Sequence, residues 1–244
     1  MDESRTRTLF RFYHLSYDSV KAEKLVSIMS ITPASSSPPQ DEGEGIASAR
    51  RTPVQGRSQE TVQRILHATS RLLERIPLEE ITTSRIAQES GVSVGGLYRF
   101  FPDKQAIVDA IAVQHVKEFE SQVRSKLLRR LPLNGTKFLN AVIDSFVAFL
   151  DERPDFRTIV FGRHISAATR EQQIRPDLGA AGLVKQALAL LFGIKDSAKL
   201  AFKIRIASET GERLLAYAYE QENAKERQRV IDELKVMLAS YLFR

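Results

Sequence analysis

The chain has 244 residues, of which 43% are hydrophobic and 27% charged, proportions typical of a folded globular protein. Its 36 Lys and Arg exceed its 30 Asp and Glu, so the net charge is +6, which is compatible with an anionic partner such as nucleic acid. The absence of Cys excludes disulfides, thiolate metal sites and cysteine nucleophiles. The four His are scattered, so we expect no metal and no cofactor. The sequence has no apolar run of about 20 residues and no secretory leader, which predicts a cytoplasmic protein without membrane contact.

Residues 1–56 differ in composition from the rest of the chain. They contain a Pro- and Ser-rich run from Pro33 to Pro39 and a Gly- and acid-rich run from Asp41 to Gly45, and such sequence cannot bury enough apolar surface to fold. Residues 9–31 either form a short helix or are untranslated sequence in front of a start at Met29. We therefore predict a disordered or mis-assigned extension over residues 1–56.

From residue 58 onward, hydrophobic residues recur with helical spacing almost everywhere. The first helix is predicted to begin at Ser58 and to end before Pro77. Further helices are predicted over residues 82–90, 94–101, 103–130, 138–154, 155–168, 178–193, 196–222 and 225–243. No alternating strand pattern is present, so the predicted fold class is all-α.

Residues 81–104 predict a helix, a tight turn and a second helix. Two helices that cross steeply need a small residue where they touch, which Ala87 supplies, and the turn needs a residue that accepts positive φ, which Gly91 supplies. Apolar residues that can hold the pair together are Ile86, Val92, Leu97 and Phe100. Ser90 is polar where an apolar residue is often found.

The helix predicted at 94–101 has an unusual outward side. With Leu97 directed inward, a turn of 100° per residue places Arg99 and Gly95 on the opposite side, with Tyr98 and Gly96 flanking them. The glycines would let the backbone approach base edges, Arg99 can pair with a guanine, and Tyr98 can reach a phosphate or a thymine methyl. This side suits the major groove of DNA, although Tyr98 could instead be a buried aromatic.

Other residues near this motif are candidates for phosphate contacts. Thr82 and Thr83 begin the preceding helix, where hydroxyls and free amides bind phosphate; alternatively, they only cap that helix. Lys104 offers a third phosphate contact at the start of the next long helix. The arginines at 50, 51 and 57 form either a solvated basic arm, which we favour, or a minor-groove reader.

The combined spacing of Arg64–Ala68, Ile81–Thr83, Ile86–Ala87, Gly91–Ser93, Leu97–Tyr98, Phe101 and Lys104 resembles the DNA-binding domain of the TetR family of transcriptional regulators over about residues 58–110. The resemblance implies an all-helical homodimer. In each copy a three-helix helix-turn-helix domain over 57–117 reads DNA, and a larger helical domain over 118–244 binds an effector and dimerises. It further implies phosphate contacts by Thr83, Tyr98 and Lys104, and a base-facing set of Val94, Gly95, Gly96 and Arg99. The chain departs from the family at 77–80, where many members have a Gly–aromatic turn.

Residues 118–244 resemble the family only in layout. The last two helices, about 196–243, have apolar stripes wider than one small core uses, so we expect them to pair with their copies as a four-helix bundle; the alternative is internal core. An effector pocket is expected between the middle helices. Its candidate residues are Phe146, Phe149, Phe161, His164, Leu191, Phe192, Arg213 and Tyr217, although the phenylalanines could be plain core and His164 a capping or surface residue.

These observations predict a DNA-binding transcriptional regulator, specifically a repressor that a small molecule releases from a palindromic operator. Its expected partners are double-stranded DNA, an unknown small-molecule effector and a second copy of the chain. An enzyme is disfavoured because the sequence has no Gly-rich phosphate loop and no clustered acid–base pair. The alternatives are a helical protein-interaction adaptor and a nucleoid-associated protein that uses the same fold without an inducer.

Overall fold

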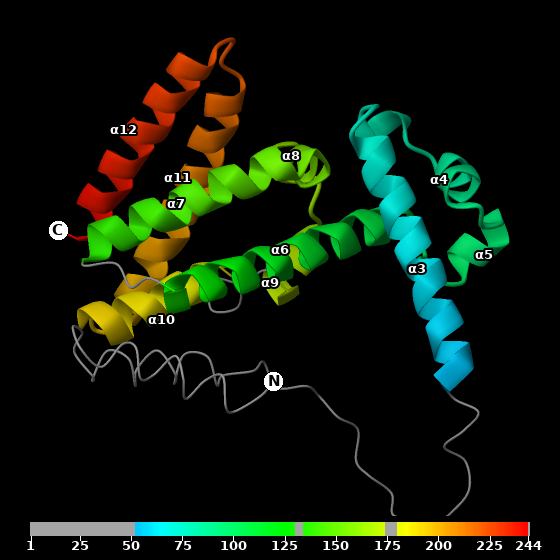
Figure 1. Cartoon of the computed structure of the whole chain (residues 1–244), viewed down its shortest axis with the longest axis horizontal. Coiled ribbons are helices and arrows are strands. Elements are labelled where there is room, and N and C mark those ends of the chain that lie inside the picture. The colour runs from blue at the N-terminus through cyan, green and yellow to red at the C-terminus, as the bar shows by residue number, and fades with distance from the viewer. Residues whose placement is uncertain (1–51, 130–133, 174–179, 244) are drawn as a thin grey trace, which may run out of the picture.

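A computed structural model describes residues 52–129, 134–173 and 180–243, and within these ranges the chain forms helices and loops with no strand (Figure 1). The predicted all-α class is therefore confirmed. The elements are α3 (Thr52–Leu73), η1 (Leu78–Glu80), α4 (Thr83–Ser90), α5 (Val94–Tyr98), α6 (Lys104–Arg129), α7 (Gly135–Glu152), α8 (Pro154–Phe161), α9 (Ala167–Gln173), α10 (Ala180–Phe192), α11 (Ala198–Tyr219) and α12 (Ala224–Leu242). The predictions for residues 1–51 lie outside the described residues.

The helices gather into two groups joined by α6. Helices α3, α4 and α5 lie together at one end of the molecule, and α6 runs from them toward the other end, where α7 and α10 to α12 are found (Figure 1). Helix α8 contacts both groups, because it packs against α3 as well as against α6, α7 and α11. Helices α11 and α12 form an antiparallel pair with extensive mutual contact. The arrangement places a small three-helix unit beside a larger helical one.

Polar side chains fix where several helices begin. Thr82, Ser93, Asn134, Ser197 and Asn223 each accept a hydrogen bond from the backbone N–H three residues further on. Such N-caps satisfy a backbone donor that the helix itself leaves unpaired. These short-range contacts explain why the sequence pattern predicts the starts of α4, α5, α11 and α12 closely.

Buried apolar side chains of both groups of helices belong to one continuous core. In the small group, Ile65, Ile86, Leu97 and Ile107 of α3, α4, α5 and α6 are completely buried. In the large group, the completely buried side chains include Phe138, Leu150, Ile159 and Leu188, with Phe149 and Leu234 almost so. Burial of apolar surface at these positions is the main contribution that holds the helices together.

Two predicted boundaries near the small group are wrong. Helix α3 begins at Thr52 rather than Ser58, so residues 52–56 belong to a helix and not to the extension. Pro53 does not prevent this, because proline is tolerated in the first turn. Helix α5 ends at Tyr98 rather than Phe101. Phe101 itself precedes Pro102, and the residue before a proline is disfavoured in helical conformation.

The single helix predicted over 155–168 is also wrong, because the chain forms two helices there. Helix α8 ends at Phe161, and Arg163 adopts a left-handed conformation with φ of 56°. A new helix, α9, begins at Ala167 after Ser166. The carboxylate of Asp109 on α6 accepts hydrogen bonds from the backbone N–H and the hydroxyl of Ser166, at 2.9 and 2.6 Å. A side chain 57 positions away therefore holds the break between the helices.

Candidate nucleic-acid interface

The predicted turn between the two short helices is present. Gly91 has a φ of 65° and ψ of 29° after the end of α4, a left-handed conformation that glycine adopts without steric cost. The next N–H, that of Val92, returns to the carbonyl of Ala87 at 3.1 Å, which closes the helix end. Ala87 is buried at the contact. The hydroxyl of the buried Ser90 donates to the same carbonyl at 3.1 Å, so its polarity is satisfied locally.

Helix α5 presents a mostly apolar outward face. Leu97 is completely buried, whereas Val94 and Tyr98 are 41% and 50% exposed, and Gly95 and Arg99 are also exposed. Tyr98 is thus not a buried aromatic. We call Val94, Gly95, Tyr98 and Arg99 the reading face. The predicted outward orientation of Gly95, Tyr98 and Arg99 is confirmed, whereas Gly96, expected to flank them, is half-buried. Contact of the reading face with bases remains a prediction.

The two glycines of α5 have different surroundings. A Cβ atom added to Gly95 would meet nothing within 4 Å, whereas one added to Gly96 would lie 3.0 Å from both the Oγ of Ser93 and the Cγ1 of Val92. Gly96 is also half-buried. Its lack of a side chain therefore serves the packing of the turn, and only Gly95 is open toward a partner.

Thr82 caps α4, and the hydroxyls of Thr82 and Thr83 can still form hydrogen bonds with a partner. The Oγ1 of Thr82 accepts a hydrogen bond from the N–H of Arg85 at 3.2 Å, which confirms the cap and leaves the hydroxyl proton able to donate elsewhere. The Oγ1 of Thr83 lies 3.2 Å from the hydroxyl of Tyr98. The structure thus brings together two of the three residues expected to contact phosphate.

Lys104 has an inward partner. Its Nζ donates to the carbonyl of Leu78 at 2.7 Å and ties the start of α6 to η1. An ammonium has three donors, so this bond leaves two, and contact of Lys104 with phosphate remains a prediction. Arg57 is exposed at the start of α3, whereas residues 50 and 51 lie outside the described part of the chain.

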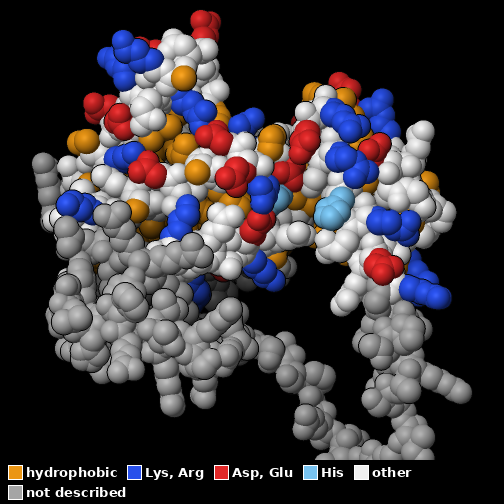
Figure 2. Space-filling model, in the orientation of Figure 1, with side chains coloured by type: hydrophobic (Ala, Val, Ile, Leu, Met, Phe, Trp, Pro, Cys, Tyr) orange, Lys and Arg blue, Asp and Glu red, His pale blue; other side chains and the backbone are white. Residues whose placement is uncertain are grey.

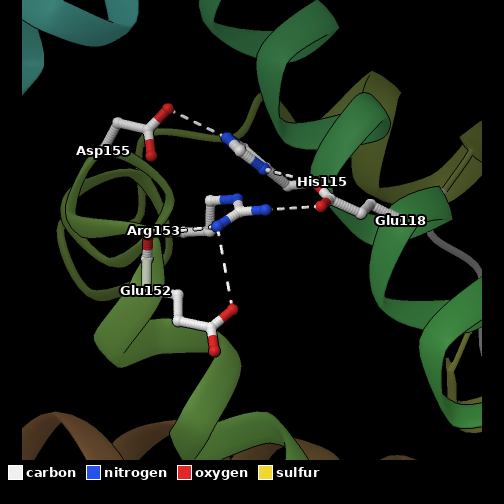
Figure 3. A network of polar contacts seen from close by, with 5 residues as sticks. All are labelled: His115, Glu118, Glu152, Arg153 and Asp155. Carbon is white, nitrogen blue, oxygen red and sulfur yellow. Dashed lines mark hydrogen bonds and ion pairs between the residues drawn. The ribbon is translucent and has the colours of Figure 1, made fainter.

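A partly buried polar cluster, formed by the buried His115 and Asp155 and the half-buried Glu118 and Arg153, lies where α6 meets α8 (Figure 3). The Nε2 of His115 is 2.9 Å from the Oδ2 of Asp155, and its Nδ1 is 3.6 Å from the Oε2 of Glu118. Arg153 binds the other oxygen of Glu118 at 2.5 Å, and its guanidinium also lies near Glu152. We call this set the junction cluster.

The junction cluster also reaches the small three-helix unit. Burial raises the pKa of the Asp155 carboxyl, but hydrogen bonds from His115 and from Ser70 of α3 outweigh burial and hold that pKa below its ordinary value. One carboxylate therefore connects α3, α6 and α8. Sequence reasoning missed it, although a charged residue in the first turn of an apolar helix was a visible signal.

The residues predicted to line an effector pocket are dispersed. Phe146 and Phe149 both contact Phe119 and Phe156, with ring centroids 5.0 to 6.5 Å apart, in an aromatic cluster between α6, α7 and α8. His115 joins this cluster with its ring 5.1 Å from Phe156. Among the predicted residues whose side chains the structure describes, these two phenylalanines are the pair that joins this cluster.

The remaining predicted pocket residues lie elsewhere. Phe161 packs on Tyr219, and Phe192 packs on Phe138. The backbone carbonyl of His164 accepts from the side chain of Gln105 at 2.6 Å. Arg213 pairs with Glu220 on the exposed side of α11, and Tyr217 is exposed on the same helix; the side chain of Leu191 is outside the described residues. Their binding of one effector remains a prediction.

An open groove of about 580 Å³ lies between α3, α6 and α9, and none of the predicted pocket residues lines it. Asp109 is its acidic group. Burial opposes ionisation of Asp109, but hydrogen bonds from Ser166 and Thr169 hold its pKa below the ordinary value. The hydrogen bonds of this carboxylate therefore hold the start of α9 against α6.

Across the three described ranges, no group of three His, Cys, Asp or Glu side chains is arranged to hold a metal ion. None of the described helices is both long and apolar enough to cross a membrane.

A helix-turn-helix with an open second helix, set beside a larger helical unit, defines a DNA-binding protein of the helix-turn-helix class. A family model described as "Bacterial regulatory proteins, tetR family" matches residues 65–111, and one described as "Tetracyclin repressor-like, C-terminal domain" matches residues 134–244. The two models together match more than half of the chain. The chain belongs to the TetR family of DNA-binding transcriptional regulators.

Solved structures share the fold over most of the chain. A TetR-family regulator from Streptomyces coelicolor has a TM-score of 0.61 and 24% identity, covering 75% of this chain and 98% of its own. One from Rhodococcus sp. RHA1 has a TM-score of 0.58 and 15% identity, covering 76% and 97%. FadR of Thermus thermophilus, a repressor solved in complex with lauroyl-CoA, has a TM-score of 0.54 and 18% identity, covering 75% and 93%.

Curated relatives match over a shorter stretch. Nucleoid occlusion factor SlmA of Haemophilus influenzae is 30% identical over 101 residues, which is 40% of this chain and 44% of the relative. SlmA of Idiomarina loihiensis is 28% identical over 106 residues, 41% and 50% respectively. The chain thus spans about half the length of the curated relatives it matches.

Proposed function

We propose that the protein is a cytoplasmic, homodimeric repressor that binds a palindromic operator through α5 of each copy and is released by a small-molecule effector. The observation that carries the proposal is the reading face, which leaves Val94, Gly95, Tyr98 and Arg99 open while Leu97 anchors the helix from behind. A helix with so little side-chain bulk fits the major groove, where base edges distinguish one sequence from another.

The residues around α4 support a fixed position on the DNA backbone. Thr82 and Thr83 stand at the start of α4, where backbone N–H groups and the helix dipole attract phosphate. The contact between the hydroxyls of Thr83 and Tyr98 holds both groups at one place, so that they can bind the same phosphate without further ordering. Contacts of this kind set the register in which the reading face meets the bases.

The surface of α11 and α12 supports a homodimer. Of the large apolar side chains that are exposed in the described residues, most lie on these two helices: Phe202, Ile206, Tyr217, Val236, Met237 and Tyr241. Figure 2 shows hydrophobic side chains at the surface of this pair among charged ones. An exposed apolar patch of this kind is typical of an interface. A two-fold dimer would place the two α5 helices about 35 Å apart, one turn of DNA.

The aromatic cluster supports an apolar effector. Phe146 and Phe149 lie among rings from three helices, beside His115 of the junction cluster, and FadR of Thermus thermophilus, which shares the fold, was solved with lauroyl-CoA. We propose that a largely apolar molecule binds near these two residues. A ligand there would act on DNA binding by favouring a conformation with a different spacing of the α5 helices.

The test is selection of duplexes from a random library by the purified full chain, followed by affinity measurement at fixed salt. We expect a palindromic sequence to be enriched. Arg99→Ala should weaken its binding about 10- to 100-fold, because an arginine–guanine pair contributes roughly 1–3 kcal/mol. Arg229→Ala is the matched control, since Arg229 is also exposed but lies on α12 with Glu226 as its partner. Unchanged affinity of Arg99→Ala would show that the reading face is wrongly assigned.

A second candidate function is nucleoid-associated DNA binding without an inducer, which the match to nucleoid occlusion factors favours. Genome-wide mapping of bound DNA separates the two. A repressor should occupy a few palindromic sites next to particular genes, whereas a nucleoid-associated protein should occupy many sites spread along the chromosome.

A further inference from the structure

We infer that Val94, together with the open backbone at Gly95, contacts the methyl group of a thymine in each operator half-site, beside a guanine bound by Arg99. The inference rests on the proposed function, because it specifies which base features the reading face recognises.

Exposure of Val94 has no benefit for the folded chain alone. Val94 is the first residue of α5 and is 41% exposed, and it is absent from the side chains that pack against the core. Valine is also a poor helix former because its χ1 angle is restricted in a helix. Within the described residues of α3 to α6, Val94 and Tyr98 are the only large apolar side chains this exposed. This side chain is therefore available for a contact outside the chain.

Tyr98 lies beside the proposed phosphate contacts and not beside the bases. Its hydroxyl lies 3.2 Å from the Oγ1 of Thr83 at the start of α4, where the phosphate contacts are proposed. Its ring is therefore held toward the DNA backbone. Val94, one turn earlier on the same side of α5, is therefore the apolar side chain that can contact a base.

Gly95 keeps the space beside Val94 empty. It needs no special backbone conformation, since only Gly91 and Gly193 have positive φ among the described glycines, and a Cβ there would meet nothing within 4 Å. A glycine in a helix costs about 1 kcal/mol relative to alanine. No feature of the fold requires glycine at position 95, whereas close approach of a partner to the helix backbone would require it.

Base chemistry identifies the partner of this apolar surface. Thymine alone among the four bases presents a methyl group in the major groove, and the other edges there are hydrogen-bonding groups. Covering such an edge with valine would leave its polar atoms unpaired, which is unfavourable. A thymine methyl against Val94 and Gly95 avoids this loss.

The position of Arg99 sets the expected distance between the two bases. Val94 and Arg99 are five residues apart, which is about 7.5 Å along a helix. Base pairs are stacked about 3.4 Å apart. With α5 lying along the groove, the thymine and the guanine should be about two base-pair steps apart.

The experiment uses the full chain and the duplexes enriched from a random library. Each thymine of the enriched half-site is replaced in turn by deoxyuridine, which removes only the methyl group, and affinity is measured by fluorescence anisotropy at fixed salt. We expect one replacement near the guanine to weaken wild-type binding about 3- to 10-fold. In Val94→Ala the same replacement should have no further effect.

Two controls and two contrary results define the test. Val113→Ala, on α6 and away from the reading face, should keep the full effect of deoxyuridine, and circular dichroism should show that both variants are folded. If wild-type protein tolerates deoxyuridine at every position, or if Val94→Ala remains as sensitive as wild type, the inference is overturned although DNA binding stands. If no duplex is enriched, the proposed function itself fails.

Discussion

Glycine occurs at three nearby positions around the turn between α4 and α5 for three different physical reasons. Gly91 has positive φ, a conformation that residues with a Cβ adopt only with strain. Gly96 leaves room for the cap of α5 and for Val92. Gly95 has neither constraint. The same residue type therefore serves backbone conformation at Gly91 and packing at Gly96, and we propose that it serves access of DNA at Gly95.

This difference predicts different effects on stability for the substitutions Gly95→Ala and Gly96→Ala. Gly95→Ala should raise the free energy of unfolding by up to about 1 kcal/mol, because alanine favours the helix and its methyl group meets nothing. It should at the same time weaken operator binding. Gly96→Ala should bring no such gain, since its Cβ would lie 3.0 Å from Ser93 Oγ. Urea unfolding and anisotropy titration measure both quantities, and equal stability changes in the two variants would contradict the assignment.

At the scale of elements, α8 is held between the two groups of helices by its first turn. Pro154 opens the helix with its fixed φ, and Asp155 follows at a position where a carboxylate interacts favourably with the helix dipole. Asp155 is almost fully buried and is bonded to His115 of α6 and Ser70 of α3. Loss of one partner in a buried polar network leaves the others without a bond. The position of α3 relative to α8 should therefore depend on this carboxylate.

Asp155→Asn should destabilise the protein at pH 7 by about 1–3 kcal/mol. The pKa of Asp155 is lowered on folding from an ordinary value of 3.8. Its stabilising contribution is therefore complete above that value and is lost as the pH falls through the lower folded-state pKa. The difference between wild type and variant should shrink on acidification below 3.8. Urea unfolding at several pH values measures it, with Asp232→Asn, an exposed carboxylate of α12, as control.

The elements that could be predicted from the sequence are those set by interactions between residues close together in the chain. The start and end of α4 and the orientation of α5 follow from Thr82, Gly91 and Leu97, because caps, turns and helical faces depend on neighbours in sequence. The break between α8 and α9 depends on Asp109, 57 residues earlier, and helical spacing gives no sign of it. The dispersal of the predicted pocket residues has the same origin, since spacing identifies a face of a helix and not the element that covers it.

At the scale of the whole molecule, the surfaces that we propose for DNA recognition and for dimer formation are separated along the chain. The reading face lies on α5, whereas the exposed apolar side chains of α11 and α12 belong to the other group of helices. Helix α6 extends from Lys104, bonded to the DNA-binding unit, into the contacts with α7 and α10. A change at the dimer surface can therefore alter operator affinity without touching any residue that contacts DNA.

Phe202→Glu tests this separation. Phe202 is 52% exposed on α11, so a charge there should leave each copy folded and disfavour only the pairing of two apolar surfaces. We expect sedimentation equilibrium to show a monomer with wild-type helical content. Its affinity for a palindromic duplex should fall roughly 100-fold or more, because the second half-site no longer binds at high effective concentration. Ala148→Glu places the same charge on the exposed side of α7 and should remain dimeric with full affinity. A Phe202→Glu protein that stays dimeric would show that the α11–α12 surface is not the interface, whereas a monomer that binds as tightly as wild type would show that the palindrome is not bound by two copies of α5.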